Sequence, residues 1–250
     1  MSRVDVLAIG AHPDDVELGC GGTLALLARQ GRRVGIVHLT RGEAGSRGTE
    51  GARRQEAEAA AATLGAAELA FLDCGDGAFR AGPAEEEALI AVVRRLRPEI
   101  VLGPTPVDRH PDHPRAHALV AAACFYAGLA ARAPRDGKPH RPAAVYSFMQ
   151  HDDFPLSFVV DVTATWETKL AALRAYRTQL YQEAEKEEEE DESGAGAPIT
   201  KVSTRAFWQM IEGRARHFGG LIGAELGEPF GARYPLAVSD LFAVLPGGVR

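Results

Sequence analysis

The stretch AIGAHPDDVELGCGG, residues 8–22, decides the fold because it joins the end of an apolar run to a group of polar side chains. The run VDVLAIG, residues 4–10, is typical of a buried strand. His12, Asp14 and Asp15 follow it directly. A turn can use Asp or Gly to reverse the chain, but it has no need of a histidine. The stretch therefore predicts a strand whose carboxyl end carries a chemical site.

Short apolar runs alternate with alanine-rich segments along the first half of the chain. The runs predict strands at residues 4–10, 33–40, 68–73 and 99–105. The segments between and after them predict helices at residues 22–30, 52–64, 84–97 and 113–125. This alternation is typical of a parallel sheet with helices on both faces. We therefore expect one α/β domain over residues 1–250, a Rossmann-like three-layer αβα fold with a mostly parallel central sheet.

The second half of the chain adds further elements and one low-complexity segment. Strands are predicted at residues 143–149 and 157–162, and helices at 166–181 and 204–226. The segment EAEKEEEEDESGAGAP, residues 183–198, carries like charges that repel one another. We expect a mobile acidic surface loop there. A metal-binding acidic tail is the alternative, but consecutive glutamates usually form a solvated face.

Composition excludes several classes of protein. The 250-residue chain has a formal net charge of −6, which offers no general basic surface for nucleic acid. No apolar run approaches the roughly 18 residues that a membrane span needs, and the amino terminus lacks the pattern of a secretory signal. Three widely spaced cysteines fit reduced thiols rather than a disulfide framework. The expected location is the cytoplasm, without membrane or nucleic-acid partners.

A second polar cluster, DRHPDHPRAH at residues 108–117, follows the predicted strand at 99–105. In open parallel sheets, ligands bind beyond the carboxyl ends of the strands, so this cluster and the first are expected to face one crevice. Either cluster alone could be a polar turn or a helix cap, because Asp and Pro are ordinary turn residues. The two together favour a functional site.

The residue types in these clusters suit a catalytic metal. Zinc in such sites takes about three protein ligands and leaves a position for water. His12, Asp15 and His113 would supply two imidazoles and one carboxylate. Other members of the clusters would remain for proton transfer and orientation, namely Asp14, His110 and Asp112. A dinucleotide-binding loop is rejected, because GCGGTLA at residues 19–25 does not match the required glycine pattern.

Four motifs together resemble the LmbE/PIG-L-like zinc-dependent N-deacetylases, which remove acetyl groups from N-acetylglucosamine derivatives. They are AHPDDVELGCGGTLA (11–25), LTRGEAGSRGT (39–49), RRQEAEAAAATLG (53–65) and DRHPDHPRAH (108–117). The resemblance runs over nearly the whole chain. The segments FVVDV and KLAALRAYRTQ are similar to the bacillithiol-pathway deacetylases, whose substrate is N-acetylglucosaminyl malate.

This resemblance implies a role for each cluster residue. It implies amide hydrolysis at a zinc ion, which iron(II) could replace, and its ligands would be His12, Asp15 and His113. Asp14 would accept a proton from the attacking water. His110, oriented by Asp112, would stabilise the tetrahedral intermediate or protonate the leaving amine.

Three arginines are candidates for binding the substrate. Arg53 falls where the family has a substrate-contacting arginine, although its neighbour Arg54 leaves that alignment open by one residue. Arg109 and Arg141 could grip a carboxylate with two parallel hydrogen bonds. Another N-acetylated sugar, such as N-acetylglucosamine or a chitooligosaccharide, is the alternative substrate. A non-catalytic metal-binding protein is a further alternative, which Asp14 argues against. The resemblance also implies a homo-oligomer, a trimer or a hexamer.

Overall fold

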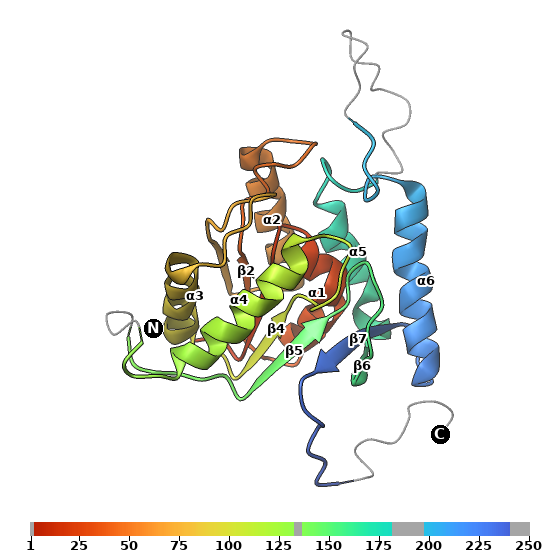
Figure 1. Ribbon diagram of the computed structural model, residues 1–250. Helices are drawn as coiled ribbons and strands as arrows, with labels where there is room; N and C mark the ends of the chain where they lie inside the picture. The colour runs from red at the N-terminus through yellow and green to blue at the C-terminus, as the bar shows by residue number, and fades with distance from the viewer. Residues whose placement is uncertain (1–2, 133–136, 182–197, 241–250) are drawn as a thin grey trace.

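The fold centres on one sheet of seven strands, in the order β3-β2-β1-β4-β5-β7-β6 (Figure 1). This computed structural model describes residues 3–132, 137–181 and 198–240. The strands are β1 Val6–Gly10, β2 Val34–His38, β3 Glu68–Phe71, β4 Ile100–Gly103, β5 Ala144–Phe148, β6 Phe158–Asp161 and β7 Gly227–Ala232.

Most of the sheet is parallel. β1 pairs in parallel with both β2 and β4, and β2–β3 and β4–β5 are parallel pairs as well. β7 is antiparallel to β5 and to β6, so β7 and β6 form an antiparallel end of the sheet. The predicted αβα fold with a mostly parallel sheet is confirmed. Five parallel strands place their carboxyl ends along one edge, which is where the two polar clusters lie.

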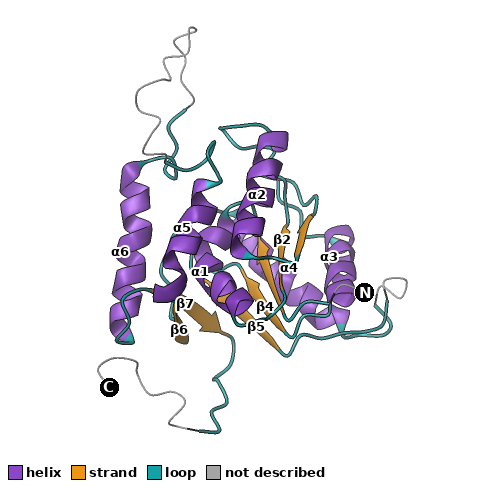
Figure 2. Ribbon diagram, turned by 180° about the vertical axis from the view of Figure 1, so that it is seen from behind, coloured by secondary structure: helices purple, strands orange, loops and turns teal. Residues whose placement is uncertain are grey.

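Helices cover both faces of the sheet (Figure 2). One apolar cluster joins Val6 and Ala8 of β1 to α1, α2, α5 and α6, and the other joins Leu7 and Ile9 to α3 and α4. Successive side chains of a strand point to opposite faces, so a strand buried on both sides is apolar throughout. The helices are α1 Asp15–Arg29, α2 Glu50–Leu64, α3 Pro83–Leu96, α4 Asp112–Ala127, α5 Trp166–Arg174 and α6 Arg205–Leu221.

The first helix differs from its prediction. α1 begins at Asp15 rather than at residue 22, and it is broken at Cys20, where φ is −146°. Glycines obscured it, because glycine has a low helix propensity. These glycines serve packing instead: a Cβ on Gly19 would overlap the Phe148 ring. The polar turn therefore leads straight into a helix, without the intervening loop that the sequence suggested.

The chain after α5 also differs from expectation. α5 ends at Arg174, whereas the sequence predicted a helix to residue 181. The Thr178 backbone N–H and hydroxyl donate to the two carboxylate oxygens of Glu56, at 2.7 and 2.9 Å, and these contacts favour a turn over further helix. β7 was not predicted, because GEPFGA lacks the apolar alternation of a strand.

Three other expectations concern the acidic loop, membrane-spanning helices and the cysteines. Residues 183–197 of the predicted acidic loop lie outside the described residues. Within the described ranges, no helix is both long enough and apolar enough to cross a membrane. Cys20, Cys74 and Cys124 are buried and form no disulfide.

Candidate active site

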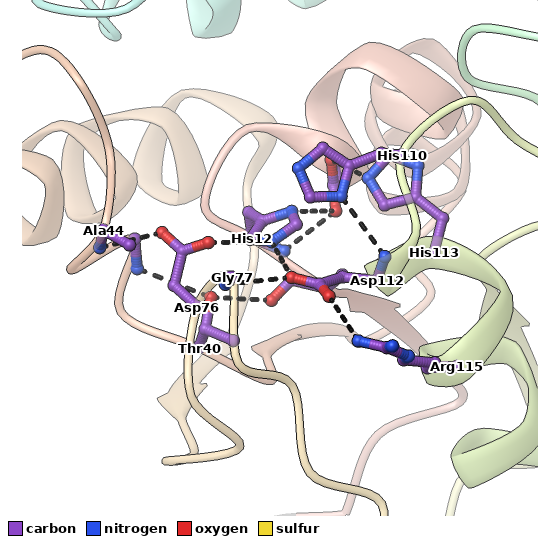
Figure 3. A network of polar contacts seen from close by, with 12 residues as sticks. His12, Thr40, Ala44, Asp76, Gly77, His110, Asp112, His113 and Arg115 are labelled. Carbon is purple, nitrogen blue, oxygen red and sulfur yellow. Dashed lines mark hydrogen bonds and ion pairs between the residues drawn. The ribbon is translucent and has the colours of Figure 1, made fainter.

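Three loops bring the predicted metal ligands and their neighbours together at the carboxyl edge of the sheet. The turn after β1 carries His12 and Asp14 and leads into α1 at Asp15, and the loop after β4 carries Asp108 and His110 and leads into α4, whose first residues are Asp112 and His113. The loop after β3 adds Asp76. These loops meet because parallel strands end at the same edge. Figure 3 shows His12, Asp76, His110, Asp112 and His113 grouped at this point.

Asp15 lies between two imidazoles. Its Oδ2 is 3.5 Å from His12 Nδ1, and its Oδ1 is 3.4 Å from His113 Nε2. The His12 backbone N–H also donates to Asp15 Oδ2, at 2.8 Å, which fixes the carboxylate in the turn. All three residues are buried. One carboxylate and two imidazole nitrogens thus face one another, which is a donor set that zinc accepts.

The outer nitrogen of each imidazole faces a different carboxylate. His12 Nε2 lies 3.2 Å from both Asp112 Oδ2 and Asp76 Oδ1, and Figure 3 shows both contacts. His113 Nδ1 lies 3.1 Å from Asp108 Oδ1. In metal sites, a carboxylate on the outer nitrogen fixes the tautomer and leaves the inner nitrogen free to bind the ion. The arrangement around His12, Asp15 and His113 therefore fits a divalent cation.

The charges at the cluster support the same conclusion. Burial alone would lower the pKa of His113, but the carboxylates of Asp15 and Asp108 raise that pKa to about 9. The pKa of His12 is also raised, because the carboxylates of Asp112, Asp15 and Asp76 outweigh its burial. Without a cation, these imidazoles would hold protons at neutral pH. A divalent cation would replace that positive charge beside Asp15.

The ring of His110 lies next to the rings of His12 and His113. Its ring centroid is 4.7 Å from that of His12 and 4.9 Å from that of His113. Ligand atoms of these three histidines all lie within 4.8 Å of one another, and so do those of His12, Asp76 and Asp112. Asp15 stays a predicted ligand, and its two oxygens face both buried imidazoles.

The sequence predicts that the Asp112 carboxylate orients His110. In the structure this carboxylate contacts His12 instead. Asp112 is the first residue of α4, and its backbone N–H reaches His110 Nδ1 at 3.3 Å. Its carboxylate instead contacts His12 Nε2 and accepts a hydrogen bond from the Gly77 N–H, at 3.1 Å. Asp112 therefore orients His12, and it touches His110 only through the main chain.

Asp14 occupies a strained position beside the cluster. Its φ is 104°, a left-handed conformation that residues other than glycine rarely adopt. Burial raises the pKa of this carboxyl to about 7, although the guanidinium of Arg53, with its nitrogen 3.5 Å from Oδ2, opposes the shift. Such strain is stored at functional sites when the surroundings fix it. A carboxylate with this pKa can exchange a proton near neutral pH.

Of the two neighbouring arginines Arg53 and Arg54, Arg53 is the buried one. It donates to the Pro13 carbonyl at 2.6 Å and to the Gly42 carbonyl at 3.3 Å. A Cβ on Gly42, whose φ is +71°, would overlap the guanidinium. Arg54 is exposed and pairs with Glu58. These contacts favour a role for Arg53 in holding the turn at Asp14, whereas the sequence predicted a substrate contact.

The other two arginines lie in different places. Arg109 is exposed in the loop that carries His110, next to the cluster. Arg141 lies three residues before β5, so it is at the opposite edge of the sheet. There its guanidinium donates to the Phe125 carbonyl at 3.0 Å and lies 4.3 Å from the centre of the Phe125 ring. The structure does not bring Arg141 to the site.

Four residues of the site had no predicted role. Gln150, two residues after β5, donates to Asp15 Oδ1 at 2.5 Å, and the His151 ring lies 5.9 Å from that of His113 and nearly parallel to it. Asp76 and Asp108 face the outer nitrogens of His12 and His113. Each follows a strand that the sequence did predict. Position at a strand's carboxyl end was the signal that could have identified them.

A buried cluster of imidazoles and carboxylates at this edge defines the class as an α/β protein with a candidate hydrolytic metal site. A family profile described as PIG-L, GlcNAc-PI de-N-acetylase, matches residues 7–124. The diacetylchitobiose deacetylase of Thermococcus kodakarensis is 32% identical over an alignment of 196 residues that covers 71% of this chain and 71% of its own. The chain belongs to the PIG-L deacetylase family.

Further comparisons extend this likeness. A 1D-myo-inositol 2-acetamido-2-deoxy-alpha-D-glucopyranoside deacetylase of Saccharomonospora viridis is 33% identical over 70% of this chain and 85% of its own. The 4-oxalmesaconate hydratase of Pseudomonas putida is 33% identical over 69% of this chain and 73% of its own. The conserved protein TT1542 of Thermus thermophilus has a TM-score of 0.83 and 33% identity, over 96% of this chain and 99% of that one.

Proposed function

We propose that this protein is a metal-dependent deacetylase that hydrolyses the N-acetyl group of an N-acetylglucosamine derivative. The observation that carries this proposal is the position of Asp15 between His12 Nδ1 and His113 Nε2, with Asp14 buried beside it. The family and its sugar deacetylases support the reaction class.

The chain's own groups have separate roles in this proposal. His12, Asp15 and His113 would hold a divalent cation, zinc or iron(II), which would supply Lewis-acid activation of water and of the acetyl carbonyl. Asp14 accepts the proton of the attacking water. The half-buried ring of His110 faces the same space and stabilises the charge that develops on the carbonyl oxygen. Asp76, Asp108 and Asp112 orient the ligating imidazoles.

The substituent on the sugar separates two candidate substrates. N-acetylglucosaminyl malate, the substrate suggested by the resemblance to bacillithiol-pathway deacetylases, would need a cation for its carboxylates. Of the three arginines that the sequence suggested, Arg53 is engaged by two carbonyls and Arg141 is remote, so Arg109, exposed beside the cluster, stays the candidate. An uncharged sugar substituent, as in the diacetylchitobiose deacetylase relative, is the other candidate.

The test measures acetate release from N-acetylglucosamine, N,N'-diacetylchitobiose and N-acetylglucosaminyl malate, with and without a chelator. We expect release of acetate together with a free amine, and loss of both with the chelator. One relative is a hydratase, so hydration of 4-oxalmesaconate is measured in parallel. Hydration without any acetate release would overturn the proposal. Metal binding without either reaction would indicate the non-catalytic alternative.

A further inference from the structure

Gln150 is a buried polar residue of the site to which the proposed function assigns no role. It lies two residues after β5, and its side-chain amide donates to Asp15 Oδ1 at 2.5 Å. An ionised carboxylate only accepts hydrogen bonds, so the end of the amide that faces Asp15 is the Nε2 donor. The proposed ligands follow β1 and β4. Gln150 therefore connects a third parallel strand to one of them.

The two oxygens of Asp15 have different donors. Oδ2 accepts from the His12 backbone N–H at 2.8 Å, within the same turn, whereas Oδ1 accepts from Gln150, which is 135 residues away in the sequence. One donor on each oxygen fixes both the position and the plane of the carboxylate, and each oxygen keeps a further lone pair. Gln150 thus helps to determine how Asp15 faces the imidazoles of His12 and His113.

The other end of the Gln150 amide supports a dedicated role. Its Oε1 is buried and accepts no hydrogen bond from any residue that the structure describes. A buried acceptor without a partner destabilises a fold, so a glutamine that served stability alone would be expected to satisfy both ends of its amide. The contact with Asp15 is therefore what this side chain contributes.

The main chain that carries the amide is itself fixed by two other parts of the molecule. Arg214, from α6, donates to the Gln150 carbonyl. The backbone N–H of the next residue, His151, donates to Asp108 Oδ2 at 3.0 Å, and the His151 ring lies against that of His113. The amide of Gln150 therefore reaches its acceptor from a backbone that is held in place on both sides.

We propose that Gln150 is a positioning residue for the metal centre, which holds the Asp15 carboxylate in the orientation that faces both imidazoles. The inference rests on the proposed function, because it concerns the ligands on which that function depends. Residues that orient a metal ligand typically contribute about ten- to a hundredfold to metal affinity. Loss of the amide is therefore expected to weaken metal binding while the fold is retained.

Three variants test this role. Gln150→Met keeps the length of the side chain and removes the donor. Gln150→Ala is a second variant that does not depend on fitting a new side chain into the site. Gln179→Met is the matched control, because Gln179 is also buried and its amide donates to the Arg47 carbonyl at 2.6 Å rather than to a residue of the cluster.

Competition with a chromophoric chelator measures the Zn²⁺ affinity of each protein, and the absorption spectrum of the Co²⁺-loaded protein reports the ligand geometry. Urea unfolding of the metal-free proteins is measured in parallel. We expect Gln150→Met and Gln150→Ala to bind Zn²⁺ about tenfold or more weakly than the parent and to change the Co²⁺ spectrum. Gln179→Met is expected to keep the parent's affinity and spectrum, whatever its effect on unfolding.

Zn²⁺ affinity equal to the parent's in both Gln150 variants would overturn the inference. An equal loss in Gln179→Met would also overturn it, because the loss would then be a general effect of removing a buried amide. Acetate release separates this inference from the proposed function. Zn²⁺ binding that depends on Gln150, without acetate release by the parent, would contradict the deacetylase function and retain the positioning role. Acetate release by the parent, with unaltered Zn²⁺ affinity in the Gln150 variants, would do the reverse.

Discussion

Asp14 differs from the other carboxylates of the site in its surroundings. Asp15, Asp108 and Asp112 lie beside imidazoles, whereas Asp14 faces a guanidinium that also holds the loop. Burial raises the pKa of Asp14 to about 7, and the charges of nearby histidines lower the pKa of Asp15. Neighbouring carboxyls with pKa values shifted in opposite directions are suited to different roles. Asp15 can stay ionised as a ligand while Asp14 exchanges a proton.

Asp14→Asn tests this division of roles. The amide keeps the shape of the side chain but cannot accept a proton from water. We expect kcat for acetate release to fall about a hundredfold or more, with metal content unchanged. Metal analysis and kinetics on one preparation check both statements. Activity comparable to the parent would place the base on another residue.

Glu17, three residues after Asp14, gives a prediction for stability. It is fully buried, and burial raises its pKa from 4.5 to about 8. The folded chain therefore holds this proton between those two values, while the unfolded chain releases it. The stability that the neutral carboxyl contributes is complete below pH 4.5 and is lost as the pH rises through 8.

Glu17→Gln removes this titration. The stability of the variant relative to the parent should grow by about 1.4 kcal/mol per pH unit across that window, because one pKa unit corresponds to that free energy. Urea unfolding at several pH values between 5 and 8, on the metal-free proteins, measures it. Glu58→Gln, at an exposed glutamate, is the control and should show no such trend. A difference independent of pH would mean that Glu17 is ionised in the fold.

At the level of elements, a buried ion pair supports the break in α1. Lys169 Nζ lies 2.6 Å from Glu228 Oε1 and donates to the Leu18 carbonyl at 2.8 Å, before the break. Glu228 accepts from the backbone N–H groups of Gly22 and Thr23, at 2.9 and 2.7 Å, after the break. Each member of the pair thus bonds to backbone groups that the break leaves free, Lys169 before it and Glu228 after it. The first segment, which begins at Asp15, is fixed in place.

Glu228→Ala should destabilise the fold by about 3–5 kcal/mol, because it leaves the Lys169 charge buried without its partner. The double variant Lys169→Met/Glu228→Ala should lose less than the sum of the single losses. Chemical denaturation of the four proteins completes this cycle. Glu212→Ala, in the exposed pair with Arg216, should cost less than about 1 kcal/mol. Additive losses at Lys169 and Glu228 would show that the two residues act independently.

The sequence predicted the elements well where burial determines the pattern. The parallel strands β1, β2 and β4 were found because they are buried in the sheet, and strands buried on both faces are continuously apolar. The start of α1 and the strand β7 were missed because their glycines and proline carry little periodic signal. Those glycines are explained by contacts with distant residues, such as Phe148 against Gly19, which a local pattern does not contain.

For the whole molecule, sheet topology explains how much of the site could be anticipated. The order β2-β1-β4-β5 places the two predicted clusters on neighbouring strands, so His12, Asp15 and His113 could be grouped in advance. The sequence could not predict which carboxylate faces which imidazole, because that depends on side-chain directions at the start of α4 and after β3. Asp112 therefore supports His12, contrary to expectation, and Asp76 joins it. A homo-oligomer stays a prediction from the family resemblance.

The proposed function requires one divalent cation, held by His12, Asp15 and His113, for deacetylation. The most direct measurement is acetate release by the chelator-stripped protein during titration with Zn²⁺. We predict that activity rises to a plateau at about one equivalent of metal per chain and stays at background throughout the titration of His113→Ala. Full activity in the stripped protein, or a titration of His113→Ala that matches that of the parent, would contradict this metal requirement.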